Sequence, residues 1–175
     1  INTSPLADND LAKLYKKYFP EITAFHCVSD AIMKVGKKYS MDPENAMTIY
    51  SGVNINKMKD FRYAYTGRSK LKLLSVGRNH WKKGYNYSIL SANLLKKSGV
   101  DFTYEIVSKE SEENNYLINL LDLKNHVKFI GTLENVDVLK KMESSDLLLL
   151  PSVEEGIANV VLEAMAIGLL VISTN

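Results

Sequence analysis

Short apolar runs and segments of helical spacing alternate along the chain after about residue 70. Each apolar run predicts a buried strand, and each segment with apolar residues on one helical face predicts a helix. The strands are expected at Leu71–Val76, Phe102–Val107, Val127–Ile130, Asp146–Leu150 and Leu169–Ser173, and the helices at Tyr87–Lys97, Glu112–Leu121, Val136–Glu143 and Asn159–Ile167. This alternation is typical of an α/β fold with a doubly wound parallel sheet and helices on both faces.

Ligands of such sheets bind at the carboxyl ends of the strands, near the point where the strand order reverses. We expect the strand at Leu71–Val76 to be central, so residues that follow it are candidates for a site. Gly77-Arg78 follows this strand directly, and Glu155 follows the strand at Asp146–Leu150.

The first part of the chain has a different pattern. A short amphipathic helix over Leu11–Phe19 ends at Pro20, and it is followed by a strand at Thr23–Val28, a helix at Ala31–Lys38 and a strand at Thr48–Tyr50. Asn54–Lys70 has weak periodicity and is interpreted as an interdomain connection. We therefore expect a boundary near residue 55, with residues 1–55 and 56–175 in different domains.

Composition and charge exclude several classes of protein. The chain has 46% hydrophobic and 24% charged residues, which is typical of a globular protein. A net charge of +2 gives no reason to expect nucleic-acid binding. The single Cys27 excludes an internal disulfide framework and fits a reducing, cytoplasmic compartment. No run of about 18 apolar residues is present, so no membrane span is expected.

The loop after the first long strand carries two cations beside glycines. Gly77 allows a sharp turn, Arg78 offers a planar fork that suits phosphate, and Lys83 adds a mobile charge before Gly84. This loop is a candidate diphosphate site, and a solvated basic loop remains the alternative.

Glu155 and Glu163 are separated by seven residues and form a second candidate group. Glu155 lies in a turn of small residues, and Glu163 lies in the first turns of the following helix. The free N–H groups at the start of that helix can bind phosphate or sugar oxygens. Ordinary surface carboxylates are the alternative reading.

Together the two groups resemble the GT-B glycosyltransferases of the retaining group 1 type, also called family 4. Gly77-Arg78 with Lys83-Gly84 is similar to the family's phosphate loop, and Glu155 to Glu163 is similar to its paired-glutamate motif. The resemblance runs from about Phe25 to Asn175. It implies that residues 1–55 are the tail of an acceptor-binding domain and that residues 56–175 are a truncated, Rossmann-like donor-binding domain.

The resemblance also implies a role for each candidate. Gly77, Arg78 and Lys83 would bind the donor diphosphate, and Glu163 would bind the ribose. The donor sugar would contact Glu155, Gly156, Ile157, Ala158 and Asn159, and the base would lie near Ile130, Gly131, Thr132 and Leu133. The implied reaction transfers a sugar from a UDP- or GDP-sugar to a hydroxyl of a glycan or lipid-linked acceptor, with retention. No metal and no cofactor are expected, and no catalytic residue is assigned.

Several features depart from the family pattern. Ile157 and Ala158 stand where Phe and Pro are usual, and Val107-Ser108-Lys109-Glu110 lacks the usual glycines. His26, His80 and His126 do not match the catalytic histidine of the acceptor domain. Asp8-Asn9-Asp10 has the form of a metal-binding Asp-x-Asp motif, but it precedes a helix, which favours a capping role.

Other readings of the sequence remain open. A GT-B-fold sugar-nucleotide epimerase and a non-catalytic nucleotide-sugar-binding module are the alternatives to a transferase. The amphipathic segment Leu11–Phe19 leaves a contact with the inner membrane face open, with packing on the acceptor domain favoured. We expect the chain to be a piece of a longer enzyme and to be inactive alone.

Overall fold

The computed structural model describes residues 9–65, 67 and 69–174, which divide into two compact units. The first unit contains the described residues up to Gly52 together with Glu154–Ala158. The second contains Val53–Val153 and the described residues from Asn159 onward. Each unit has a hydrophobic core of its own, so each is described separately.

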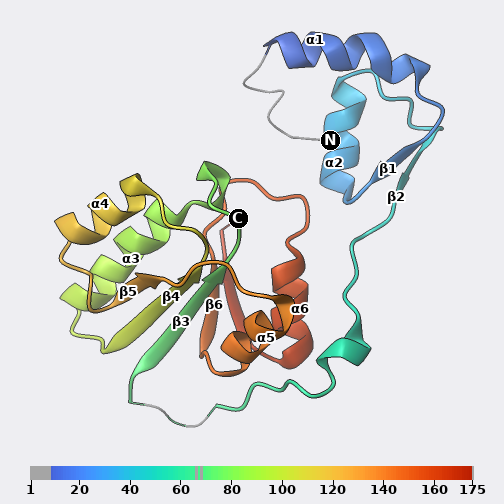
Figure 1. Cartoon of the computed structure of the whole chain (residues 1–175). Coiled ribbons are helices and arrows are strands. Elements are labelled where there is room, and N and C mark those ends of the chain that lie inside the picture. The colour runs from blue at the N-terminus through green and yellow to red at the C-terminus, as the bar shows by residue number, and fades with distance from the viewer. Residues whose placement is uncertain (1–8, 66, 68, 175) are drawn as a thin grey trace. The chain divides into compact units, whose positions relative to one another are not determined.

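The second unit is an α/β domain built on a parallel sheet (Figure 1). Its elements are η3 (Ile55–Met58), β3 (Leu71–Val76), η4 (Trp81–Lys83), α3 (Tyr85–Lys97), β4 (Phe102–Val107), α4 (Glu112–Leu120), β5 (Val127–Phe129), α5 (Asn135–Glu143), β6 (Leu147–Leu150), α6 (Asn159–Ile167) and β7 (Leu170–Ser173). Within the described residues the five strands lie in the order β5-β4-β3-β6-β7, and every pair is parallel. The prediction of a parallel sheet with Leu71–Val76 at its centre is confirmed.

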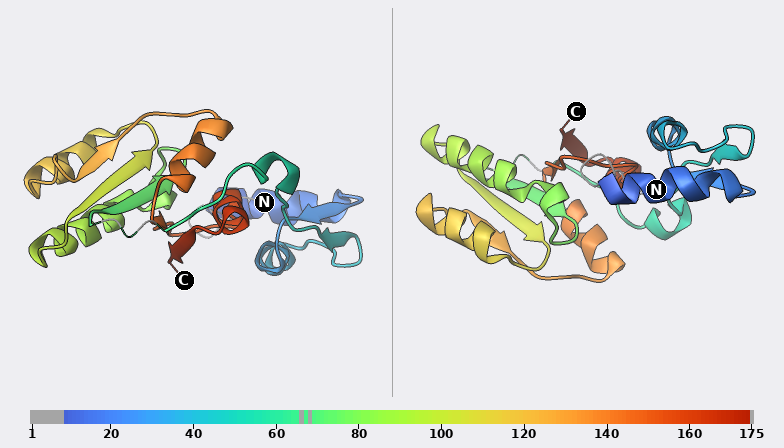
Figure 2. Two further views of the ribbon diagram at one scale, coloured as in Figure 1. Left: turned by 90° about the horizontal axis from the view of Figure 1, so that it is seen from below. Right: turned by 90° about the horizontal axis from the view of Figure 1, so that it is seen from above.

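Side chains that alternate between the two faces of the sheet divide the core into two layers. Leu73 of β3 and Tyr104 of β4 pack with residues of α3 and α4 on one face of the sheet. Leu74 and Val107 pack with residues of α5 and α6 on the other face. Successive side chains of a strand point to opposite faces, so the two layers follow directly from the apolar runs. Figure 2 shows the same strands and helices from two further directions.

A buried hydroxyl network ties α3 to the sheet. The Tyr104 hydroxyl donates to Ser88 Oγ at 2.7 Å and lies 2.7 Å from Ser75 Oγ, which in turn donates to the Leu149 carbonyl at 2.6 Å. Burial raises the pKa of Tyr104, so its hydroxyl stays protonated and keeps its role as a donor.

The segment before β3 contributes to the core of the second unit. Met58 is buried there, and Phe61 and Tyr63 pack against the same cluster. The Tyr63 amide also donates to the Ile167 carbonyl at 2.8 Å at the end of α6. Part of Asn54–Lys70, interpreted from the sequence as a connection, is therefore an integral part of this domain.

The first unit contains the helices and strands predicted for it, with one strand shorter and the other shifted along the chain. They are α1 (Asn9–Tyr18), η2 (Phe19–Glu21), β1 (Phe25–Cys27), α2 (Asp30–Lys38) and β2 (Ala46–Thr48). The strand expected at Thr48–Tyr50 begins earlier, because Phe25 pairs with Ala46 and Cys27 with Thr48. Cys27 is fully buried, with its thiol 3.9 Å from the Met41 sulfur.

None of the helices in the described ranges combines the length and apolar character that a membrane-spanning helix requires.

Candidate functional site

The loop after β3 brings Lys83 against Gly77. A Cβ atom at Gly77 would lie 3.1 Å from Lys83 Cε and 2.9 Å from the Tyr85 hydroxyl. The Gly77 amide donates to the Val107 carbonyl at 3.1 Å, which holds the loop at the carboxyl end of the sheet. The absence of a side chain at Gly77 therefore lets the Lys83 stem approach the Gly77-Arg78 backbone.

The turn that carries Lys83 is fixed at both ends. His80 Nδ1 accepts a hydrogen bond from the Lys82 amide at 3.2 Å, so the imidazole caps the turn. Val153 donates to the Lys82 carbonyl at 2.7 Å and attaches the turn to the segment after β6. Gly84 closes the turn with φ of 60°. The capping role of His80 was not predicted, because a side-chain cap of so short a turn has no distinctive spacing.

A hollow of about 440 Å³ lies at the carboxyl ends of β3, β4 and β5. Its polar rim contains Gly77, Arg78, Asn79, Lys109 and Thr132, and its apolar wall contains Val76, Val107, Leu133 and Val138. The hollow thus joins residues predicted to bind a diphosphate with residues predicted to bind a base. An apolar wall and a cationic rim suit a flat, apolar ring attached to an anionic group.

Two residues of this hollow were not predicted. Lys109 follows β4 and adds a second cation, and Asn79 donates from Nδ2 to the Glu110 carbonyl at 3.1 Å. The Asn79 bond connects the loops after β3 and β4. The rule that identified Gly77-Arg78 applies equally to Lys109, since β4 is the parallel neighbour of β3.

Ile130 and Gly131 stand just outside this hollow. Ile130 donates to the Ile106 carbonyl at 3.0 Å and packs against the core on the α5 and α6 face. Gly131 connects it to Thr132. Of the predicted base-binding segment, Thr132 and Leu133 line the hollow.

Glu163 lies on α6 with a half-buried side chain. Its Oε1 accepts a hydrogen bond from Asn135 Nδ2 at 3.2 Å. Asn135 begins α5 shortly after Thr132-Leu133. The predicted ribose-binding carboxylate is therefore hydrogen-bonded to the helix that follows Thr132 and Leu133, two residues that line the hollow.

Four of the five residues predicted to bind the donor sugar fall in the first unit. Glu155, Gly156, Ile157 and Ala158 form an irregular turn that groups with the first unit. Asn159, also predicted for the sugar, belongs to the second unit and begins α6. Within the second unit, the structure brings together Gly77, Arg78, Lys83, Thr132 and Leu133.

Comparison with known proteins decides the family. The family model described as "Glycosyl transferases group 1" matches residues 62–175, which include the hollow and α6. The chain belongs to the group 1 glycosyl transferases.

Two relatives each match 59% of this group 1 chain. An uncharacterized glycosyltransferase of Haemophilus influenzae is 37% identical over 105 residues, covering 59% of this chain and 29% of the relative. The amylovoran biosynthesis glycosyltransferase AmsK of Erwinia amylovora is 33% identical over 112 residues, covering 59% of this chain and 28% of the relative. The matched part of the chain therefore spans less than a third of the length of either relative.

The fold agrees with this assignment. The crystal structure of Anabaena HepE in complex with UDP-glucose superposes with a TM-score of 0.78 at 19% identity, covering 95% of this chain and 49% of HepE. The Rossmann-like GT-B architecture expected from the sequence is thus confirmed.

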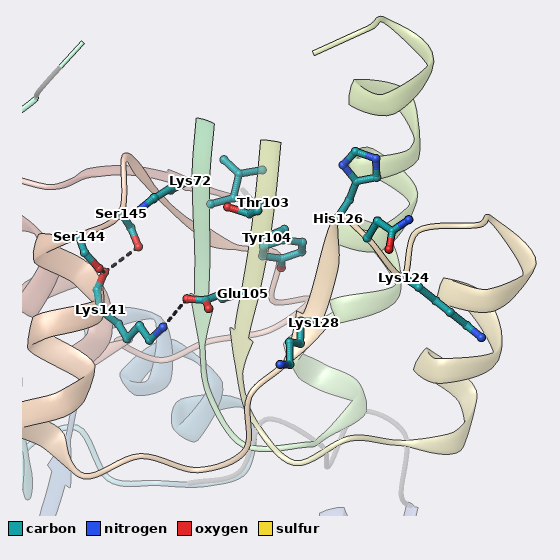
Figure 3. Close-up of a pocket in the computed structure, with 12 residues that line it drawn as sticks. Lys72, Thr103, Tyr104, Glu105, Lys124, His126, Lys128, Lys141, Ser144 and Ser145 are labelled. Atoms are coloured by element: carbon teal, nitrogen blue, oxygen red, sulfur yellow. Dashed lines mark hydrogen bonds and ion pairs between the residues drawn. The ribbon is translucent and has the colours of Figure 1, made fainter. Parts of the chain in front are cut away.

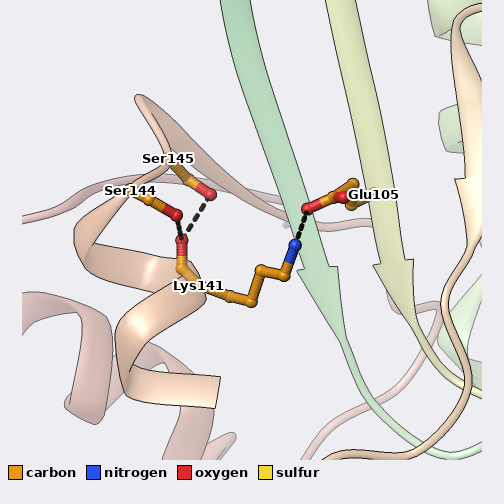
Figure 4. A network of polar contacts seen from close by, with 4 residues as sticks. All are labelled: Glu105, Lys141, Ser144 and Ser145. Atoms are coloured by element: carbon orange, nitrogen blue, oxygen red, sulfur yellow. Dashed lines mark hydrogen bonds and ion pairs between the residues drawn. The ribbon is translucent and has the colours of Figure 1, made fainter. Parts of the chain in front are cut away.

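A second hollow of about 280 Å³ lies on a sheet face of this group 1 domain (Figure 3). Lys72, Glu105 and Lys128 enter it from three adjacent strands, and Lys141 of α5 donates to Glu105 Oε2 at 2.7 Å. The Lys141 carbonyl also accepts bonds from the Ser144 and Ser145 hydroxyls at 3.0 and 2.7 Å (Figure 4). These contacts attach the end of α5 to β4.

We expect the Glu105–Lys141 ion pair to contribute little to stability. Both side chains are 36% exposed, so solvent screens their attraction. A double-mutant cycle with Glu105→Gln and Lys141→Met should give a coupling energy of about 0.5–1 kcal/mol in urea unfolding. Neither variant should alter nucleotide affinity. A coupling well above this range would contradict the screening argument.

Proposed function

We propose that the whole protein transfers a sugar from a nucleotide-diphosphate sugar to a hydroxyl of a glycan acceptor, with retention and without a metal ion. The observation that carries the proposal is the hollow that joins Arg78 and Lys109 to Thr132 and Leu133. Its position at the carboxyl ends of a parallel sheet is where α/β domains bind nucleotides. HepE, which shares the fold, was crystallised with UDP-glucose, and this supports a nucleotide sugar as donor.

Arg78 and Lys83 have a defined task in this proposal. During transfer, the bond between the anomeric carbon and the diphosphate oxygen breaks, and negative charge grows on the diphosphate. Arg78 and Lys83 would stabilise that charge with donors fixed in advance, which is the most effective form of electrostatic catalysis. Their charges would take the place that a metal ion fills in metal-dependent transferases.

The carboxylates would hold hydroxyl groups. Glu163 would accept hydrogen bonds from the ribose, and the Glu155 turn with the start of α6 would contact the donor sugar. Carboxylates accept two hydroxyls well when these are adjacent. The acceptor would bind to the part of the protein outside this chain. By analogy with the relative that acts in amylovoran biosynthesis, we propose polysaccharide assembly at the cytoplasmic side of the membrane.

The proposal is tested by incubating the whole protein with UDP-glucose, GDP-mannose and related donors, with and without a glycan acceptor. We expect nucleoside diphosphate release that depends on the acceptor, and a product with the donor's anomeric configuration by NMR. Residues 1–175 alone should show no transfer. Epimerised donor without acceptor would indicate an epimerase instead, and donor binding without turnover would indicate a binding module.

A further inference from the structure

Glu163 is held by a neighbour that belongs to another helix. The carboxylate lies on α6, and the amide that donates to it at 3.2 Å belongs to Asn135, the first residue of α5. A carboxylate only accepts hydrogen bonds, so the amide must present its NH₂ group to Glu163. Asn135 is therefore the donor of this hydrogen bond and Glu163 the acceptor.

This bond adds little to the packing of the two helices. Asn135 is exposed, whereas α5 and α6 share a core formed by Val138, Leu139, Met142, Ala164 and Ile167. An exposed side-chain hydrogen bond contributes little to stability beside such a core. Its main consequence is for the Glu163 side chain, whose three rotatable bonds leave the carboxylate free to turn when no partner holds it.

We propose that Asn135 is a positioning residue that orients the Glu163 carboxylate for the vicinal hydroxyls of the donor ribose. This inference rests on the proposed function, in which Glu163 binds the ribose. The Asn135 amide occupies Oε1, so Oε2 and the remaining lone pairs of the carboxylate accept from the 2′- and 3′-hydroxyls. When the Glu163 carboxylate is already oriented, less side-chain entropy is lost on binding the nucleotide.

The test compares the affinity of the whole protein for UDP or GDP, whichever binds more tightly, with its affinity for the 2′,3′-dideoxy analogue. The ratio of the two affinities measures ribose recognition alone. Asn135→Asp keeps the shape of the side chain and replaces the donor by a second carboxylate. We expect it to reduce the ratio at least tenfold with unchanged affinity for the dideoxy analogue. Asn135→Ala should reduce the ratio about three- to fivefold.

The matched control is Asn119→Asp, an exposed asparagine on α4. It should leave the ratio unchanged, and thermal midpoints of all variants should stay near that of the wild type. In turnover assays the effect of Asn135→Ala should fall on KM for the donor and leave kcat nearly unchanged. An effect on stability with an unchanged ratio would overturn the positioning role.

Glu163→Ala separates this inference from the proposed function. If Glu163→Ala abolishes the preference for ribose and Asn135→Asp does not, the positioning role of Asn135 is wrong and the ribose site stands. If Glu163→Ala leaves the preference intact, the ribose assignment is wrong and the role of Asn135 is wrong with it.

Discussion

Arg78→Ala in the whole protein is expected to weaken binding of UDP or GDP by about 10- to 100-fold. Charge-assisted hydrogen bonds of this kind contribute about 1.5–3 kcal/mol, and each 1.4 kcal/mol corresponds to a factor of ten. Arg78 lines the hollow at the end of β3, where the guanidinium can bind two phosphate oxygens at once. Titration calorimetry at fixed ionic strength measures the change directly.

Two further variants make this prediction specific. Arg62→Ala removes an exposed arginine outside the residues that line the hollow and should leave affinity unchanged. Arg78→Lys keeps the charge and loses the planar fork, so it should restore only part of the affinity. The salt dependence of binding should also decrease in Arg78→Ala. Equal affinity of wild type and Arg78→Ala would remove Arg78 from the diphosphate site.

The domain that carries Arg78 could be predicted closely because its strands are rich in apolar residues and its helices are bounded clearly. β3 and β4 have the bounds expected from the sequence, and α6 begins at Asn159 and ends at Ile167 as expected. The helix α3 starts earlier than expected, at Tyr85, because its first turn is built directly on Gly84.

Two of the residues that were not predicted act through contacts between distant segments. Asn135 reaches a residue on the next helix, and Asn79 reaches the loop of a neighbouring strand. No local pattern encodes either contact, because each depends on how two loops or helices meet after folding. The strand at Ala46–Thr48 shows the same effect, since its position is set by pairing with β1.

The largest effect on stability is expected from Gly84→Ala. Gly84 has φ of 60°, which is unfavourable for any residue with a side chain, and a Cβ atom there would overlap the Pro151 carbonyl oxygen. Pro151 is buried backbone at the end of β6, so it has no flexible end that can move aside. We expect the whole protein to lose about 3 kcal/mol or more of unfolding free energy, measured by chemical denaturation with and without bound nucleotide.

Gly99→Ala is the control that separates the effect of the positive φ from the effect of the overlap with Pro151. Gly99 has a similar φ of 71°, but a Cβ atom there would meet nothing within 4 Å. Gly99→Ala should therefore lower the unfolding free energy only by the cost of the left-handed backbone conformation, roughly 1–2 kcal/mol. It should leave nucleotide affinity unchanged. Gly84→Ala should also lower nucleotide affinity, because the turn that it closes carries Lys83 and is attached to the segment after β6. Equal losses of stability in the two variants would mean that the turn moves away from Pro151 without cost, and that Lys83 is not held rigidly against Gly77.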